Sequence, residues 1–220
     1  MMKKIVEQNK SCSIFRVDSE YLRKIAEFVV KANYSHHTGG VYPENISDEI
    51  DAVYQEEKKF ASTSQLYIAE NSDGKMIGCI RVAKWDLVNE LPIKRIFNID
   101  PLERINNIEP TSSVWHVGRF AVDSHAGIST ISLFKQLMIY AITPICKEVG
   151  SYMVAECDCK LLRVMELLEI ETIRLGDGIH YLGSETIPVY ATREGLLNFF
   201  HRFRTAGNSE NNYKSVMNVA

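Results

Sequence analysis

Apolar and polar positions along the chain predict helices and strands in mixed order. Apolar residues recurring at helical spacing predict helices over 20–32, 48–60, 129–148 and 159–169. Short apolar or alternating runs predict strands over 13–17, 114–123, 151–157, near 172–182 and over 186–191. The resulting order is strand, two helices, two strands, an insert, and then strand, helix, strand, helix and two strands.

Two stretches decide how the strands pair. In 64–85, two apolar runs flank Asn-Ser-Asp-Gly, which predicts an antiparallel hairpin. The strand–helix–strand unit from 114 to 157 requires a parallel crossover. We therefore expect an α/β (α+β) fold with a mixed, mostly antiparallel central sheet flanked by helices.

The polar stretches predict loops and a boundary. Gly-Gly and Pro within 34–44 predict a loop that carries His36 and His37, and the long insert 87–113 is expected to hold short helices and to shape a site. We expect one domain over 1–205, followed by a flexible tail over 206–220.

Composition narrows the class of protein. The chain has 220 residues, 45% of them hydrophobic and 24% charged, as in ordinary globular domains. Its net charge of -3 argues against a nucleic-acid partner. No run reaches the roughly 18 apolar residues of a membrane span, and the N-terminus lacks an apolar leader. The five cysteines lie mostly in apolar runs without the spacing of a zinc site, so we expect a reduced, cytoplasmic protein without a bound metal.

The turn after the central strand is a candidate anion site. Gly127 allows the backbone to bend, and Ile128, Ser129 and Thr130 open a helix whose free N–H groups and dipole suit a phosphate. A plain structural turn is the alternative interpretation.

The order of elements around this turn resembles the GNAT acyltransferase superfamily. In that superfamily the turn, usually Gln/Arg-x-x-Gly-x-Gly/Ala, holds the phosphate of coenzyme A or phosphopantetheine. Ser124-x-x-Gly127-x-Ser129 stands in its place here. The resemblance implies that the donor is acyl-CoA or the phosphopantetheine of acyl carrier protein. Ser124 stands where the motif usually begins with a long polar or basic residue, and this difference favours acyl carrier protein as the donor.

A narrower resemblance covers about 14–200. "GCIRV" (78–82) and "WHVGRFAVD" (115–123) look like motifs of the acyl-homoserine lactone synthases, the N-acyl amino acid synthases and the ornithine or glycine lipid acyltransferases. Lys24, Phe28 and Tyr34 keep the spacing of an Arg, an aromatic residue and a Trp of the synthases, and Asp48 and Asp51 match their paired acids. The substrate-binding residues implied by the resemblance are Lys24, Phe28, Tyr34, Asp48, Asp51, Arg81 and Trp115.

Acyl transfer to an amine needs a polarised thioester carbonyl and a deprotonated amine. Phe120, Ala121 and Val122 are placed to offer backbone N–H groups to the carbonyl. His116 occupies the position where the related families have Glu, so it is a candidate base, and the change indicates an acceptor other than that of a lactone synthase. Glu156 on the next strand is the alternative base.

Each of these residues also has a structural interpretation. His116 can be a core histidine bonded to a carbonyl, and Glu156 a charge at a strand end. Strict alternation would put His116, Gly118 and Phe120 on one face of the strand and Arg119 on the other. Arg119 and Arg81 lie in apolar strands and need anionic partners, for which Asp48 and Asp51 are the candidates, either in a structural network or in substrate binding.

These observations predict an N-acyltransferase that moves a medium or long acyl chain from acyl carrier protein or acyl-CoA to the amine of an amino acid or similar small molecule. One alternative is a short-chain, acetyl-CoA-dependent amine N-acetyltransferase. Bulky side chains that close a tunnel for the acyl chain beside the central strands would favour it. The other is a non-enzymatic acyl-thioester-binding module, which absence of both His116 and Glu156 from the cleft would favour. The catalytic candidates are His116, Glu156 and Arg119.

Overall fold

A computed structural model describes residues 2–105, 112–181 and 184–204. In these residues a nine-stranded sheet runs in the order β1-β2-β3-β4-β5-β6-β9-β7, and β8 pairs with β9. The strands are β1 Lys3–Gln8, β2 Ser13–Val17, β3 Ser64–Glu70, β4 Met76–Lys84, β5 Ser113–Val122, β6 Ser151–Asp158, β7 Ile173–Arg174, β8 Ile179–Tyr181 and β9 Ser184–Thr192. The β5–β6 pair is parallel and the other pairs are antiparallel. The expected mixed, mostly antiparallel sheet is confirmed.

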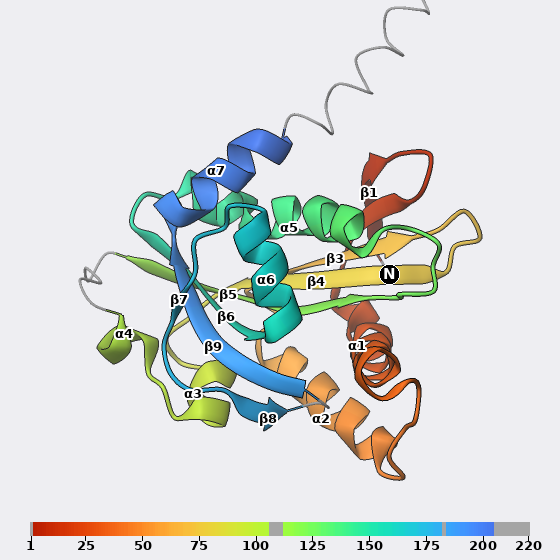
Figure 1. Cartoon of the computed structure of the whole chain (residues 1–220), viewed down its shortest axis with the longest axis horizontal. Helices are drawn as coiled ribbons and strands as arrows, with labels where there is room; N and C mark the ends of the chain where they lie inside the picture. The colour runs from red at the N-terminus through yellow and green to blue at the C-terminus, as the bar shows by residue number, and fades with distance from the viewer. Residues whose placement is uncertain (1, 106–111, 182–183, 205–220) are drawn as a thin grey trace, which may run out of the picture.

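Helices cover both faces of the sheet (Figure 1). They are α1 Leu22–Thr38, α2 Ile46–Lys59, α3 Pro92–Phe97, α4 Pro101–Arg104, α5 Thr130–Lys147, α6 Cys159–Leu167 and α7 Arg193–Arg204, with a short 3-10 turn over Ser19–Tyr21. Helices α5, α6 and α7 lie over one face, where the largest hydrophobic cluster forms, and α1, α2 and α3 lie over the other. Burial of these apolar helix faces against the sheet holds the layers together.

One expectation for the elements is wrong, and two elements were not predicted. Helix α1 continues to Thr38 because no helix breaker occurs before Gly39, which ends it with a φ of 67°. His36 and His37 therefore lie in the last turn of α1. Strand β1 was not predicted because its side chains are largely exposed at the sheet edge and show no apolar alternation. Helix α7, which buries Leu196, Phe199 and Phe200, was also missed. The predicted tail 206–220 lies outside the described residues.

Strand β5 contains a bulge that changes which way its side chains face. Arg81 pairs with Gly118 and Cys79 with Ala121, so β5 has one more residue than β4 in this interval. Arg119 takes up the extra length in a left-handed conformation, with a φ of 57°. The expected alternation therefore fails after Gly118, since Arg119 turns toward α2 and Phe120 toward α5.

Beyond His116 the two central strands separate. Ser113–His116 pairs with Ser151–Val154, and the described residues show no β5–β6 pairing past that point. Asp123 donates its N–H to Ile77 O on β4, so by alternation the N–H groups of Phe120 and Val122 face the open edge of β5. The bulge and the separation together produce the gap in which the candidate site lies.

Candidate active site

The separated strands enclose a cavity of about 110 Å³, which we call the inner cavity. His116, Gly118, Arg119 and Phe120 of β5 line it from one side, and Ala155 to Asp158 of β6 line it from the other. Residues from helices on both faces of the sheet complete the walls, among them Asn33 and Ile96 on one face and Met138 and Met165 on the other. The cavity therefore connects the two faces through the sheet.

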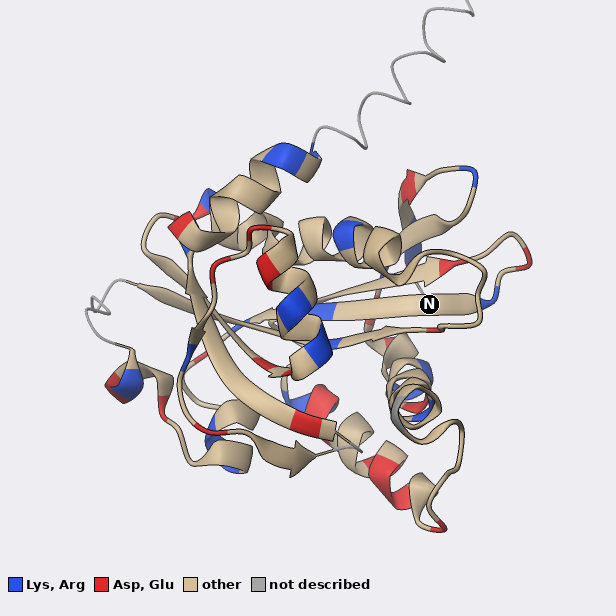
Figure 2. Cartoon of the chain, in the orientation of Figure 1, with Lys and Arg blue, Asp and Glu red and all other residues tan. Residues whose placement is uncertain are grey.

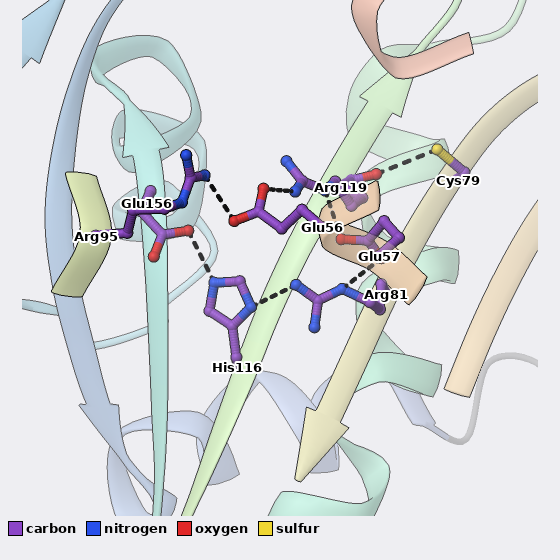
Figure 3. Close-up of polar contacts among 8 residues, drawn as sticks. All are labelled: Glu56, Glu57, Cys79, Arg81, Arg95, His116, Arg119 and Glu156. Atoms are coloured by element: carbon purple, nitrogen blue, oxygen red, sulfur yellow. Dashed lines mark hydrogen bonds and ion pairs between the residues drawn. The ribbon is translucent and has the colours of Figure 1, made fainter. Parts of the chain in front are cut away.

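A continuous chain of polar contacts borders this cavity (Figure 3). His116 Nε2 lies 2.8 Å from Glu156 Oε2, and His116 Nδ1 lies 2.5 Å from Arg81 Nη2. Arg81 Nε is ion-paired with Glu57 Oε2 at 2.9 Å. The side chains of Arg81 and Glu57 are fully buried and that of His116 is 2% exposed, so these interactions act at low dielectric.

The same chain continues to the bulge and the insert. Arg119 Nε donates to Glu57 Oε1 at 2.7 Å, and its Nη2 donates to Glu56. Glu56 also accepts from Arg95 Nη2 of α3 at 2.7 Å. The left-handed backbone at Arg119 is thus fixed by two glutamates of α2.

The buried charges shift one another's pKa values. Burial alone would raise the pKa of Glu56, but the positive charges of Arg119 and Arg95 lower it below the usual glutamate value. Burial opposes the charged form of Arg119, yet Glu57 and Glu56 raise the pKa of its guanidinium. For Arg81 burial dominates and lowers the pKa, with Glu57 acting in the opposite direction.

The hydrogen-bond donors in this chain define the protonation of His116. A guanidinium has only donors, so the ring nitrogen that faces Arg81 must be the acceptor. Nδ1 therefore carries no proton, and Nε2–H donates a hydrogen bond to Glu156 Oε2. Glu156 Oε1 is buried and has no hydrogen-bond partner among the described residues, and the Glu156 side chain lines the inner cavity.

A second cavity, of about 290 Å³, opens next to the inner one and is called here the outer cavity. Phe120, Ala121, Val122 and Thr130 line it, together with Lys160 at the start of α6. The two cavities share Asn33, Phe120, Phe134, Asp158 and Leu161. Phe120, Ala121 and Val122, which were predicted to bind the thioester, thus lie beside the inner cavity. The outer cavity that they line extends to Thr130 at the predicted phosphate turn.

The turn itself keeps the predicted features. Gly127 has a φ of 71° and nothing within 4 Å of the position that a Cβ would occupy. Ser129 is the N-cap of α5 without a side-chain capping bond, so the first N–H groups of this helix stay available to an anion. Ile128 packs against the main hydrophobic cluster. Lys160 of α6 adds a positive charge beside the outer cavity, and Figure 2 shows Lys or Arg on that helix.

Other predicted residues lie away from the inner cavity. Lys24 and Phe28 line a separate cavity of about 510 Å³, called here the lysine-lined cavity, with Lys31 and Lys75. Tyr34 donates to Glu49 on α2 at 2.8 Å. Trp115 packs in the core on the α5 side and donates to Glu148.

Asp48 and Asp51 are wrong as partners of the buried arginines. Both are exposed on α2, and Asp51 pairs with Arg23 at the surface. Glu56 and Glu57 hold that role instead. A signal was available, because Ile50, Val53 and Glu57 lie at helical spacing on one face, which places Glu57 in the core.

The described residues offer neither a metal-ligand cluster nor a membrane-spanning helix. No cluster of three or more His, Cys, Asp or Glu in this part of the chain is arranged to hold a metal ion. None of its helices is both long and apolar enough to cross a membrane.

The sheet order and the separation of its two central strands are those of the GNAT fold, as the order of elements along the sequence predicts. No family model matches the chain, and no curated protein matches its sequence. The comparison with solved structures identifies the fold at identities of 12–15%.

Three of these structures are similar over most of their length. TofI in a ternary complex with an inhibitor and MTA has a TM-score of 0.56 at 12% identity, covering 89% of this chain and 96% of that one. FeeM, an N-acyl amino acid synthase from uncultured soil microbes, has a TM-score of 0.54 at 15% identity, covering 83% and 91%. The AHL synthase LasI has a TM-score of 0.52 at 13% identity, covering 91% and 96%.

Proposed function

We propose that the protein is an N-acyltransferase that moves an acyl group from a phosphopantetheine thioester to the amine of a small molecule. The observation that carries this proposal is the inner cavity between β5 and β6, into which both His116 and Glu156 project. The AHL synthase and N-acyl amino acid synthase with the same fold support it by analogy.

The open edge of β5 supports binding of the thioester. The N–H groups of Phe120 and Val122 face the gap, where they can donate to the carbonyl oxygen and stabilise the charge that develops on it. The turn at Gly127 and the free N-terminus of α5 would hold the phosphate. The outer cavity would hold the pantetheine arm that joins this phosphate to the thioester.

The His116–Glu156 pair supports the acid–base step. The acceptor amine gives up a proton to this pair, its nitrogen attacks the carbonyl carbon, and the C–S bond breaks. The thiolate that leaves takes up a proton, so the balance is an amine and a thioester giving an amide and a thiol. In this proposal Arg119 maintains the bulge through Glu56 and Glu57, so it positions β5 without touching the substrate.

The size of the inner cavity supports a short acyl group in place of the expected medium or long one. Its volume of about 110 Å³ is below the roughly 150 Å³ of an apolar cavity that holds one benzene. Phe134, Met138 and Met165, each nearly fully buried, form its wall on the α5 side. The short-chain, acetyl-CoA-dependent amine N-acetyltransferase is therefore the second candidate, and it differs from the first in acyl length and in taking its acyl group from acetyl-CoA.

The donor and the compartment also belong to the proposal. Acyl-CoA and acyl carrier protein present the same phosphopantetheine to the turn, so both remain candidate donors. The described cysteines are free, which fits a reducing compartment such as the cytoplasm.

The experiment is a panel of thioesters from acetyl to palmitoyl, each on coenzyme A and on carrier protein, with amino acids and small amines as acceptors. Products are detected by mass spectrometry. The proposal expects amide formation that Glu156→Gln reduces by at least about 100-fold, as for loss of a general base. Absence of amide from every combination would contradict it, and thioester binding without turnover would favour the non-enzymatic module.

A further inference from the structure

The contacts of His116 distinguish the two candidate bases. The only lone pair that a neutral imidazole offers is on its unprotonated nitrogen, here Nδ1. That lone pair faces Arg81 Nη2 at 2.5 Å, and the other nitrogen donates to Glu156 Oε2 at 2.8 Å. Both ring nitrogens are therefore engaged, and His116 has no site left at which to accept a proton from an amine.

Glu156 has the group that His116 lacks. One carboxylate oxygen, Oε2, accepts the hydrogen bond from His116 Nε2–H, while Oε1 is buried without a partner among the described residues, in a side chain that lines the inner cavity. A buried carboxylate oxygen left without a donor is costly unless a ligand completes it. An ammonium or amine in the cavity supplies that donor.

Arg81 is held so that it can face only one way. Its Nε pairs with Glu57, its guanidinium lies over the ring of Phe60 with 5.2 Å to the centroid, and its Nη2 reaches His116. The side chain is fully buried, so its orientation is set by packing and by these contacts. Gly118 lies next to both side chains, and its lack of a Cβ leaves room for the contact between Arg81 and His116.

We infer that Arg81 and His116 are positioning residues that act through Glu156: Arg81 fixes the Nε2–H tautomer of His116, His116 orients the Glu156 carboxylate, and Oε1 of Glu156 is the proton acceptor. This inference rests on the proposed function. In the step, the amine N–H proton moves to Glu156 Oε1, the C–N bond forms as the C–S bond breaks, and the proton passes to the departing thiolate. His116 keeps its own proton throughout.

The substitution His116→Gln tests this assignment, because a glutamine amide offers one acceptor and one donor but is not a base at neutral pH. It can accept from Arg81 and donate to Glu156 as the imidazole does. We expect His116→Gln to keep kcat within about tenfold of the wild type, whereas Glu156→Gln loses about 100-fold or more and His116→Leu, which makes neither bond, loses most of the activity. Thermal unfolding of each variant shows which losses come from misfolding.

The inference is overturned if His116→Gln loses more activity than Glu156→Gln. If His116→Gln folds and loses activity as fully as Glu156→Gln, or if Glu156→Gln retains wild-type kcat, then His116 is the base. If wild-type protein forms no amide from any donor and acceptor, the proposed function fails first.

A second measurement does not depend on activity. In protein labelled with ¹⁵N in its six histidines, two-bond ¹H–¹⁵N spectra at pH 7.5 report each ring's tautomer, and His116→Gln identifies the signal of His116. The expected signal is the neutral Nε2–H tautomer. An Nδ1–H tautomer or an imidazolium at this position overturns the inference whatever the activity data show.

Discussion

Gly118 lies so close to His116 that a Cβ at this position would stand 3.0 Å from the imidazole Cε1 and 3.4 Å from Arg81 Nη2. This close approach allows the His116 ring to reach Arg81 and Glu156 at the same time. The glycine is required here for space, since its backbone is not left-handed.

Gly118→Ala should therefore displace the imidazole. We expect kcat to fall on the order of tenfold, because small displacements of catalytic groups slow the reaction strongly. KM for the donor should change less. The matched control is Gly176→Ala, where a Cβ would meet Ile99 Cδ1 at the same 3.0 Å but outside the cavities described above. Equal kcat values for the two variants would contradict the prediction.

Glu57→Gln should lower the free energy of unfolding by about 3–5 kcal/mol, because it removes the charge that Arg81 and Arg119 share in the core. Urea denaturation measures the change. Asp51→Asn is the control, since the Asp51–Arg23 pair is more than half exposed and its loss should cost about 0–1 kcal/mol. The prediction is wrong if the two substitutions cost the same.

Acid should destabilise the fold in part through Glu56. Its pKa is lower in the folded chain than its ordinary value, because Arg119 and Arg95 outweigh the effect of burial. Such a carboxylate stabilises the folded state at neutral pH. This contribution declines as the pH falls below the unfolded value of about 4.3 and through the lower folded value. Urea midpoints measured from pH 6 to pH 3 should fall less steeply for Glu56→Gln than for the wild type. The exposed Glu44→Gln serves as control and should leave the slope unchanged.

Gly127→Ala should raise KM for the thioester donor several-fold while leaving kcat nearly unchanged, because it strains the turn proposed to hold the phosphate. Alanine in the left-handed region costs about 1–2 kcal/mol. Gly39→Ala is the matched control, since Gly39 has a φ of 67° against 71° for Gly127 and neither has an atom within 4 Å of its Cβ position. Both variants should lose similar stability, and a donor KM that rises equally in both would argue against the phosphate site.

Met138→Ala should extend the acyl chains that the enzyme accepts. Its side chain is 2% exposed and lines the inner cavity on the α5 side, so truncation enlarges the space beside the strands. The readout is kcat/KM across the acetyl-to-palmitoyl panel. Met76→Ala, at a position in the cluster under α1 that is 4% exposed, should cost a comparable free energy of unfolding, about 2–5 kcal/mol, without changing the chain-length profile. If Met138→Ala leaves the chain-length profile unchanged, then this wall of the inner cavity does not limit the length of the acyl chain.

The sequence predicted the sheet, most helices and the strand on which the site lies, because apolar periodicity and turn residues are local signals. It could not predict which acids neutralise Arg81 and Arg119, since that pairing joins α2 to β4 and β5 across long separations in the chain. The matched spacing of Asp48 and Asp51 pointed to the exposed side of α2, whereas Glu56 and Glu57 on the same helix are buried.

The side-chain alternation of β5 failed for a related reason. Nothing in "HVGRFAV" marks Arg119 as left-handed, because its conformation depends on Glu56 and Glu57, which approach only when α2 packs on the sheet. His116 and Glu156 were both identified as candidates. The proposal that assigns them different roles depends on the contact between His116 and Arg81.

The bulge at Arg119 also fixes the length of this part of the chain. Ala121 contributes to the cluster under α1, while Phe120 and Val122 pack with the cluster under α5. One residue fewer between His116 and Asp123 would make this interval of β5 as long as that of β4, which would abolish the bulge and the left-handed turn that directs Arg119 to Glu56 and Glu57. One residue more would exchange the faces of the side chains that follow it. Insertions and deletions should therefore accumulate in the hairpin turn at 71–75 of homologous chains and be excluded from 116–123, whatever substitutions those positions tolerate.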